Sequence, residues 1–220
     1  MNSTMNSTMK RIVFCDFDGT ITTEETFVAL LRQFTPDLAD TLMAEIYAKR
    51  LTLREGVRQM LTSIRSEQYL AIVAFAQAKA IRPGFDRFLD FLEANQVPFV
   101  LISGGITVMV ETVIGDRKSR MAGIHAIDLD TQGEFLTPIS RFEAGSEFVA
   151  KVNVMAEYPC DEAIAIGDSI TDLNMAMAAP VVFARDRLAT YLQEANKPYY
   201  AWEDFDDIRQ QLAKSWGVTP

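Results

Sequence analysis

Cysteine, histidine and long apolar runs are all scarce in this chain. Its 220 residues include two cysteines, Cys15 and Cys160, and one histidine, His125. Two cysteines exclude a disulfide scaffold, and neither has the spacing of a metal-ligand pair, so a reducing compartment is expected. No run approaches the roughly 20 apolar residues of a membrane helix, and no signal-peptide pattern follows the N-terminus. The sequence therefore predicts a cytoplasmic protein with no membrane partner.

Positive charge is also in deficit. Lysine and arginine number 21 against 30 aspartates and glutamates, which gives a net charge of -9. Such an acidic chain repels nucleic acid, so no nucleic-acid partner is expected. A small anionic substrate is compatible with this charge, because a metal ion and a few cations can reverse the sign inside one pocket.

Short apolar runs alternate with amphipathic segments along most of the chain. Strands are predicted at Ile12–Cys15, Pro98–Ile102, Ala163–Ile166 and Val181–Ala184. Helical spacing occupies Phe85–Asn95 and Asp172–Ala179. This alternation predicts an α/β fold, a Rossmann-like parallel sheet wrapped by helices. The segment Ile124–Ile139 differs and predicts a hairpin that turns at Gln132-Gly133.

The interval between the first two strands is too long for one crossover helix. Its apolar spacing is helical throughout, so residues 22–82 are expected to form an inserted helical cap domain. Residues 10–21 and 83–220 then form the core, with Pro83-Gly84 at the return. The opening MNSTMNSTMK repeats a polar tetrapeptide, which predicts a disordered leader over residues 1–9 or a functional start at Met9.

Polar residues follow three predicted strands at their carboxyl ends. Asp16 and Asp18 follow the first strand, Ser103-Gly104-Gly105 follow the second, and Gly167-Asp168-Ser169 follow the third. Ligands of open parallel sheets bind at this edge. We therefore expect these side chains to converge on one pocket.

Four carboxylates in this pocket, those of Asp16, Asp18, Asp168 and Asp172, cannot all stay ionised without a counter-charge. Mg²⁺ is the natural partner, because it prefers oxygen ligands and keeps room for a substrate phosphate. With Mg²⁺ and one lysine the site still sums to minus one. A dianionic phosphate therefore requires a proton on one aspartate, which we assign to Asp18.

A carboxylate can attack phosphorus and form an aspartyl-phosphate, which divides hydrolysis into two steps. Asp16, the first residue after the strand, is the candidate nucleophile. Asp18 is then placed to protonate the leaving alcohol and to deprotonate the attacking water. Gly19 permits a tight turn, and Thr20 supplies backbone and hydroxyl donors for the phosphoryl group.

The ordered motifs DFDGT, SGG and GDSITD resemble the haloacid dehalogenase superfamily, in its Mg²⁺-dependent phosphatase branch with a helical cap (subfamily IB). The resemblance implies that Asp16 is the nucleophile and Asp18 the acid/base. Ser103, with Gly104 and Gly105, would bind the phosphoryl group.

The third and fourth motifs complete this resemblance. Lys151 would supply the lysine, although Lys118 is an alternative from the sequence. Asp168 would ligate Mg²⁺ with Asp16 and the Asp18 carbonyl. Asp172 would support these ligands, or would act only as a helix N-terminal charge.

The cap position resembles that of phosphoserine phosphatases, which implies that Glu25 contacts substrate. The alternative is a capping box, since Thr22 and Glu25 have the S/T-x-x-E spacing. Those enzymes also carry two cap arginines for the substrate carboxylate. The corresponding stretch here is Arg58-Gln59-Met60, so phosphoserine is the secondary expectation.

A closer resemblance is to the methionine-salvage phosphatases, which act on 2-hydroxy-3-keto-5-methylthiopentenyl-1-phosphate. It rests on LTLREGVRQM, on IRPGFDRFLDFLEANQVPFVLISGG and on the tail from FARDRLATYLQEANK onward. One departure is that 136–150 lacks the cysteine-rich insertion of some members. The sequence therefore predicts a phosphomonoesterase acting on a small phosphorylated metabolite. The alternatives are phosphoserine or another small ester, or a non-catalytic phosphometabolite-binding protein, against which the intact Asp16/Asp18 pair argues.

Overall fold

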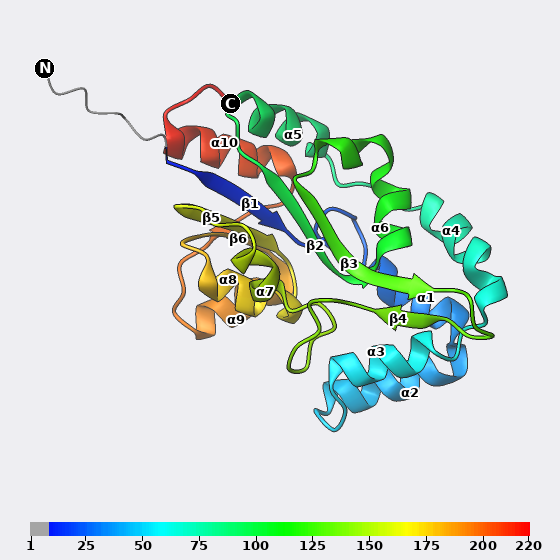
Figure 1. Cartoon of the computed structure of the whole chain (residues 1–220). Helices are drawn as coiled ribbons and strands as arrows, with labels where there is room; N and C mark the ends of the chain where they lie inside the picture. The colour runs from blue at the N-terminus through cyan, green and yellow to red at the C-terminus, as the bar shows by residue number, and fades with distance from the viewer. Residues whose placement is uncertain (1–8) are drawn as a thin grey trace, which may run out of the picture.

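The computed structural model describes residues 9–220, so the predicted leader lies outside the described residues except for Met9. A seven-stranded sheet in the order β4-β3-β2-β1-β5-β6-β7 forms the centre of the described part (Figure 1). Its strands are β1 Arg11–Cys15, β2 Phe99–Ile106, β3 Gly123–Asp130, β4 Thr137–Ile139, β5 Glu162–Gly167, β6 Val181–Ala184 and β7 Tyr200–Ala201. Neighbouring strands are parallel except β3 and β4, which are antiparallel.

The predicted parallel sheet is confirmed, and so is the antiparallel hairpin between β3 and β4. The hairpin also joins the main sheet, because β3 pairs in parallel with β2. Strand β1 lies in the middle, where Val13 is opposite both Phe99 of β2 and Ile164 of β5. Helices cover both faces of this strand, which explains its continuous apolar sequence IVFC.

Helices of the core pack on the two faces of the sheet. Helices α5 (Phe85–Ala94) and α10 (Phe205–Trp216) lie together on one face, while α7 (Lys151–Ala156), α8 (Leu173–Ala178) and α9 (Asp186–Glu194) lie on the other (Figure 1). Phe88 of α5 stacks on Phe205 of α10, and both belong to the buried apolar cluster. Helix α6 (Thr107–Ile114) follows β2 and contacts β3.

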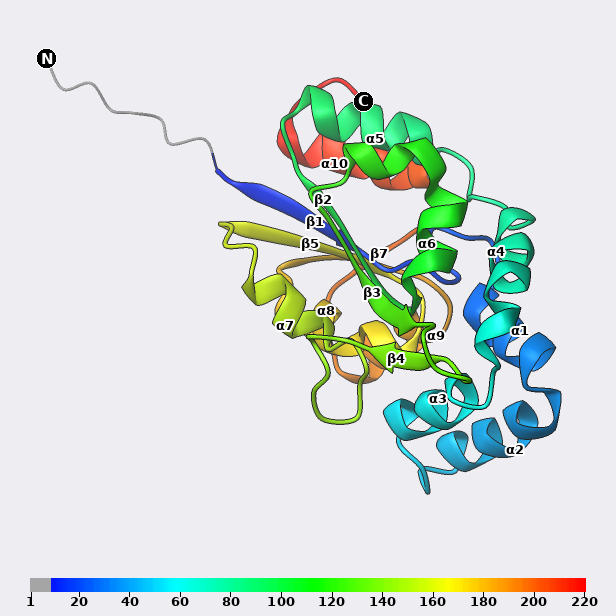
Figure 2. The ribbon, with the colours of Figure 1, turned by 45° about the vertical axis from the view of Figure 1, so that its right-hand side comes forward.

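Four α-helices lie between β1 and α5, the helix that precedes β2. They are α1 Thr26–Phe34, α2 Pro36–Tyr47, α3 Leu53–Leu61 and α4 Tyr69–Gln77. Figure 2 shows them grouped at one end of the sheet, beside α6 and β4. The Leu136 N–H donates to the Ile64 carbonyl at 2.9 Å, which connects the β3–β4 turn to the loop after α3. Their assignment to a separate cap domain over 22–82 stays a prediction.

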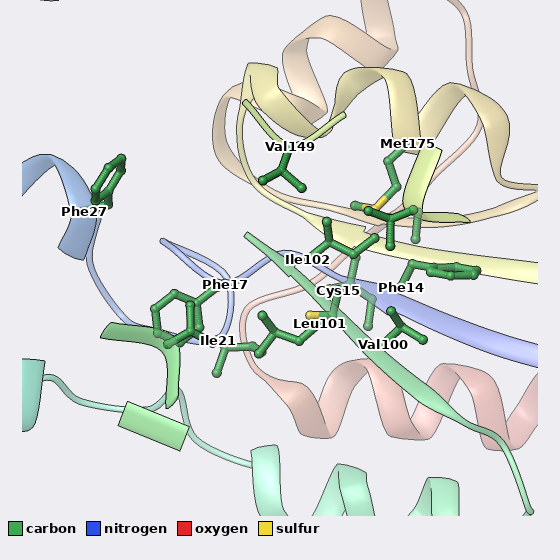
Figure 3. Packing of buried hydrophobic residues seen from close by; sticks show 14 of the residues in the cluster. Phe14, Cys15, Phe17, Ile21, Phe27, Val100, Leu101, Ile102, Val149 and Met175 are labelled. Atoms are coloured by element: carbon green, nitrogen blue, oxygen red, sulfur yellow. The ribbon is translucent and has the colours of Figure 1, made fainter. Parts of the chain in front are cut away.

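Buried apolar residues connect the sheet to the start of these helices. Phe14 and Cys15 of β1 pack near Leu101 of β2, and the cluster continues through Phe17 and Ile21 after the strand (Figure 3). The loop that carries Asp16 and Asp18 is therefore anchored by its own apolar residues. No helix of residues 9–220 is long and apolar enough to cross a membrane.

Candidate active site

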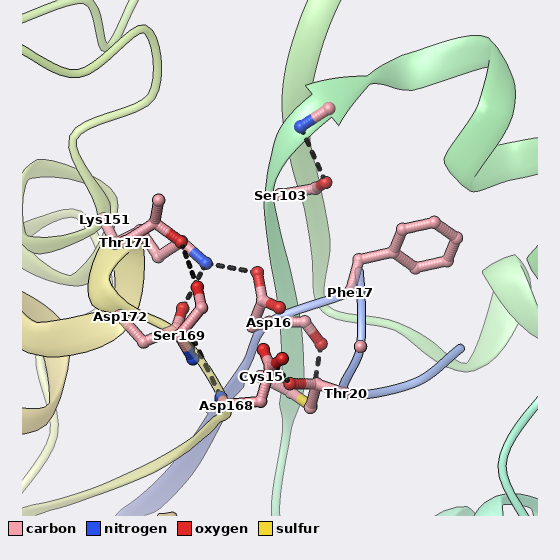
Figure 4. Close-up of polar contacts among 12 residues, drawn as sticks. Cys15, Asp16, Phe17, Thr20, Ser103, Lys151, Asp168, Ser169, Thr171 and Asp172 are labelled. Carbon is pink, nitrogen blue, oxygen red and sulfur yellow. Dashed lines mark hydrogen bonds and ion pairs between the residues drawn. The ribbon is translucent and has the colours of Figure 1, made fainter. Parts of the chain in front are cut away.

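The register of β1 and β5 brings the first and last motifs together. Cys15 lies opposite Ile166 in this parallel pair, so Asp16 and Asp168 leave the sheet at the same edge. One carboxylate oxygen from each of Asp16, Asp168 and Asp172 lies within 4.8 Å of the others. All three side chains are buried, and Figure 4 shows them around one point. Three of the four carboxylates predicted to share one pocket therefore lie together, and the fourth, that of Asp18, is outside this cluster.

Lys151 is the cation of this cluster. It is the first residue of α7, it is 1% exposed, and its ammonium contacts Asp16 Oδ1 and Asp172 Oδ1, the latter at 2.5 Å (Figure 4). The alternative lysine, Lys118, is exposed, and its ion pair within residues 9–220 is with Glu111, at 3.9 Å. Lys151, the lysine predicted for the third motif, is therefore the one that contacts the candidate nucleophile Asp16.

The Asp172 carboxylate connects Lys151 to the backbone of the Asp168 loop by hydrogen bonds. Its Oδ2 accepts hydrogen bonds from the backbone N–H groups of Asp168 and Ser169, both at 3.0 Å. Its other oxygen binds Lys151. The side chain is fully buried and completes a capping box with Ser169 at the start of the following helical turn. Asp172 therefore does lie at a helix N-terminus, but this is not its only role, because it also binds Lys151.

Negative charge exceeds positive charge in the cluster. Burial raises the pKa of Asp16 well above its usual value, and the nearby Asp172 carboxylate adds to this effect. The same two causes raise the pKa of Asp168 to about 7. Burial lowers the pKa of Lys151, but Asp16 and Asp172 outweigh it and raise that pKa overall. Three carboxylates and one ammonium leave a formal charge of minus two.

This donor set fits a hard divalent cation. The cluster offers carboxylate oxygens only, the kind of ligand that Mg²⁺ prefers, and its formal excess of two negative charges equals the charge of one such ion. Gly19 adjoins the cluster with φ +74°, and a side chain there would overlap Asp168 Oδ2. The residues present therefore suit magnesium and leave no space for a larger residue at position 19.

Asp18 lies apart from the three clustered carboxylates. Its Oδ1 accepts hydrogen bonds from the Thr26 hydroxyl and from the Phe27 N–H, the latter at 3.0 Å, at the start of α1. Burial raises the pKa of Asp18 to about 6, although these hydrogen bonds oppose the shift. Asp18 can therefore carry a proton near neutral pH, as an acid/base requires.

Ser103 lies inside β2, because this strand continues to Ile106. The Ser103 hydroxyl accepts from the Gly105 N–H at 3.0 Å, where the pairing of β2 with β3 shifts register. Helix α6 begins four residues later, so Ser103 is not its N-cap. A side chain at Gly104 would meet no atom within 4 Å, whereas one at Gly105 would come within 3.1 Å of Asp18.

Glu25 precedes α1 and makes no side-chain capping bond, so the capping-box alternative is wrong. The hydroxyl of Thr22 instead accepts from the Gly19 N–H at 3.1 Å. Glu25 lines an open pocket of about 480 Å³ that also borders Gly19, Asp168 and Arg187. A contact between Glu25 and substrate stays a prediction.

Thr20, His125 and Arg82 are polar residues that lie at different distances from the cluster. The Thr20 hydroxyl donates to Asp168 Oδ1 at 3.1 Å, so its side chain supports a cluster carboxylate. His125 of β3 lies outside the cluster, where it contacts the Tyr158 hydroxyl at 2.8 Å and packs against Phe142. Sequence reasoning missed Arg82, whose guanidinium binds the turn after Asp18. The only signal was a charged residue directly before Pro83-Gly84.

Comparison with solved structures places the fold beside that of phosphoserine phosphatases. A phospho-aspartyl intermediate analogue of phosphoserine phosphatase matches with a TM-score of 0.67 at 16% identity, covering 92% of this chain and 99% of the other. A substrate-bound phosphoserine phosphatase complex gives a TM-score of 0.67 at 15% identity, covering 92% and 98%. At this identity the likeness concerns the fold alone.

Sequence relatives span nearly the whole chain. A 2-hydroxy-3-keto-5-methylthiopentenyl-1-phosphate phosphatase of Microcystis aeruginosa is 51% identical over 206 residues, 93% of this chain and 98% of the relative. A phosphatase of the same name from Bacillus cereus is 33% identical over 208 residues, 91% and 94% of the two chains. The haloacid dehalogenase-like hydrolase family matches residues 13–177, a range that contains every clustered aspartate and Lys151. On this sequence match and on the sheet and cluster that accompany it, the chain belongs to the haloacid dehalogenase-like hydrolase family.

Proposed function

We propose that this chain is a Mg²⁺-dependent phosphomonoesterase that hydrolyses 2-hydroxy-3-keto-5-methylthiopentenyl-1-phosphate through an aspartyl-phosphate. The observation that carries the chemistry is the buried cluster in which Asp16 meets Lys151 and lies beside Asp168. The identity of 51% over 93% of the chain supports the choice of ester. The free thiols of Cys15 and Cys160 fit a cytoplasmic location within this proposal.

The first step transfers the phosphoryl group to Asp16. Lys151 binds Asp16 Oδ1, which leaves Oδ2 as the attacking oxygen. A bond forms between Oδ2 and phosphorus while the bond from phosphorus to the ester oxygen breaks. Asp18 donates its proton to the departing oxygen, which a pKa of about 6 makes available near neutral pH.

The second step releases phosphate. Asp18, now ionised, accepts a proton from a water molecule whose oxygen bonds to phosphorus. The bond from phosphorus to Asp16 Oδ2 breaks, so Asp16 returns to its carboxylate form and inorganic phosphate leaves. Ser103 and Lys151 would hold the phosphoryl oxygens, so catalysis rests on positioning and charge neutralisation.

Asp16, Asp168 and the Asp18 carbonyl would hold the magnesium ion. When bound, the ion supplies the positive charge that lets the carboxylates and a phosphate dianion occupy one site. The chain contributes the geometry, because the Thr20 hydroxyl donates to Asp168 and the Asp172 carboxylate binds Lys151.

The contacts of Arg58 in α3 favour a substrate ester that carries no amino-acid carboxylate. Its guanidinium donates two hydrogen bonds to Glu143, at 2.8 and 2.7 Å, and lies over the Phe148 ring at 4.6 Å. A cap arginine already neutralised by Glu143 is a poor partner for a substrate carboxylate. Phosphoserine is therefore the second candidate, favoured by Glu25 at the pocket and by the phosphoserine phosphatase fold.

The test is hydrolysis of a panel of phosphorylated metabolites with Mg²⁺, with the salvage ester and phosphoserine compared by kcat/KM. We expect the salvage ester to lead and EDTA to abolish activity. Asp16→Asn should abolish hydrolysis of p-nitrophenyl phosphate, while Asp40→Asn on exposed α2 should not. A lead for phosphoserine would replace the substrate, and a wild type inert toward every ester would favour the phosphometabolite-binding protein.

A further inference from the structure

Arg82 is a buried cation at the point where the chain returns from α4 to the core. It is 9% exposed, and its backbone N–H donates to the Ile21 carbonyl at 2.7 Å. The neighbouring Ile81 forms a β-bridge with Thr22, so the two linkers of the α1–α4 segment lie side by side here. Within residues 9–220, Arg82 makes no ion pair with a carboxylate. A buried guanidinium without an ionic partner must be satisfied in another way.

Its partners are backbone carbonyls of the turn that follows Asp18. Arg82 Nε donates to the Thr20 carbonyl at 2.8 Å. Nη2 donates to the Gly19 carbonyl at 2.6 Å and to the Thr22 carbonyl at 3.2 Å. The planar fork of a guanidinium can bind three such carbonyls at once, whereas an ammonium acts as a point charge. Arg82 therefore fixes the path of this turn.

The turn in question contacts the candidate metal ligand Asp168. The Thr20 hydroxyl donates to Asp168 Oδ1 at 3.1 Å, and Gly19 packs so closely that a side chain would overlap Oδ2 of the same residue. A displacement of the Gly19 and Thr20 carbonyls would therefore move groups in direct contact with Asp168. By holding the turn in place, Arg82 thus sets the distance between the nucleophile loop and the Asp168 carboxylate.

The Arg82 guanidinium also packs against the ring of Trp202. The Arg82 guanidinium lies over the Trp202 ring at 5.3 Å, and that of Arg185 lies over the same ring at 5.2 Å. Trp202 is only 3% exposed, so its ring is held in place by the packing around it. Arg82 Nη1 also reaches the Glu203 carbonyl, at 3.4 Å, in the segment that leads to α10. The orientation of the Arg82 guanidinium is therefore fixed by its contact with the Trp202 ring as well as by its hydrogen bonds.

We propose that Arg82 is a positioning residue for the reaction. It holds the carbonyls of Gly19, Thr20 and Thr22 so that Asp16, the Asp18 carbonyl and Asp168 stand at the spacing one magnesium ion requires. The inference rests on the proposed function for its chemistry. Its geometry rests on the buried guanidinium that binds three carbonyls of the nucleophile loop.

The experiment compares Arg82→Lys and Arg82→Gln with the wild type. Mg²⁺ binding is measured by isothermal titration, kcat and KM with p-nitrophenyl phosphate, and folding by circular dichroism and thermal melting. Removal of groups that orient metal ligands weakens metal binding or activity by about 10- to 100-fold. We expect both variants to bind Mg²⁺ more weakly and to lose kcat by that order, with KM for the ester changed far less. Arg82→Lys should recover little, because it keeps only the charge.

Lys79→Gln is the matched control. Lys79 lies on the same returning linker and pairs with Glu24 on the outgoing linker at 3.1 Å, without a bond to the Gly19, Thr20 or Thr22 carbonyls. The Lys79→Gln substitution removes a cation from the paired linkers of the α1–α4 segment and should leave the Mg²⁺ affinity at the wild-type value.

Three outcomes would overturn the inference. They are folded Arg82 variants with wild-type Mg²⁺ affinity and kcat, an equal loss in Lys79→Gln, and failure of both Arg82 variants to fold, which would make the role structural only. If the wild type hydrolysed no ester, the proposed function would fall. The Mg²⁺ titration would still decide the role of Arg82.

Discussion

Asp168→Asn should make the metal-free protein more stable while it destroys magnesium binding. The carboxylate of Asp168 is 6% exposed and lies beside Asp172, which together raise its pKa from 3.8 to about 7. The amide of asparagine has nearly the same shape, and its oxygen can still accept the hydrogen bond from Thr20. The variant therefore removes the buried charge and keeps the packing.

The magnitude follows from linkage between protonation and folding. Native Asp168 keeps a proton that the unfolded chain releases, so the metal-free wild type loses stability as the pH rises from about 4 through about 7. The full difference of about three pH units corresponds to about 4 kcal/mol, present at pH 8. Since a chain of this size gains about 2–4 °C per kcal/mol, Asp168→Asn should melt about 10 °C higher in EDTA at pH 8.

Thermal melting by circular dichroism at pH 6 and pH 8, with EDTA or with Mg²⁺, provides the assay. The wild type should gain stability from Mg²⁺, by about 2.7 kcal/mol at a concentration one hundred times Kd, whereas Asp168→Asn should not respond. Asp40→Asn, whose side chain is 82% exposed, should stay within about 0.5 kcal/mol of the wild type. A variant no more stable than the wild type in EDTA, or one with the full Mg²⁺ response, would refute the reasoning.

Three further perturbations test the rest of the site. Lys151→Met should cost about 3–5 kcal/mol of unfolding free energy in urea titrations, because it leaves buried carboxylates without their cation; a loss below 1 kcal/mol would contradict this. At saturating Mg²⁺, kcat/KM should decline as the pH rises above about 6, since protonated Asp18 is present below its raised pKa and lost above it. A flat profile from pH 5 to pH 8 would remove Asp18 as the acid. Glu143→Gln should raise kcat/KM for phosphoserine about tenfold relative to p-nitrophenyl phosphate, because Arg58 loses its carboxylate partner; equal ratios would exclude Arg58 from substrate choice.

Local patterns in the sequence carried most of the fold and the centre of the site. Apolar runs of four or five residues with polar ends identified β1, β5 and β6, because a strand covered on both faces must be apolar throughout. The parallel arrangement then placed Asp16 and Asp168 at one edge, since the carboxyl ends of parallel strands coincide. The family resemblance suggested Lys151 as the cation but left Lys118 open, and the fold decided between them.

Side-chain direction and partners that are distant in the chain were decided only by the tertiary structure. The sequence left Glu25 between a substrate contact and a helix cap, and the fold excluded the cap because Thr22 turns back to Gly19. It placed the Asp18 carboxylate in one pocket with those of Asp16, Asp168 and Asp172, whereas packing of α1 against the nucleophile loop turned it toward Thr26.

Arg82 illustrates the physical reason. Its contacts with Gly19 and Thr20 join positions more than 60 residues apart, and they exist only once the linkers of α1 and α4 lie side by side. A pattern along the chain reports which face of an element is apolar. It does not report which distant carbonyls a buried guanidinium will bind, because that depends on how the packed elements meet.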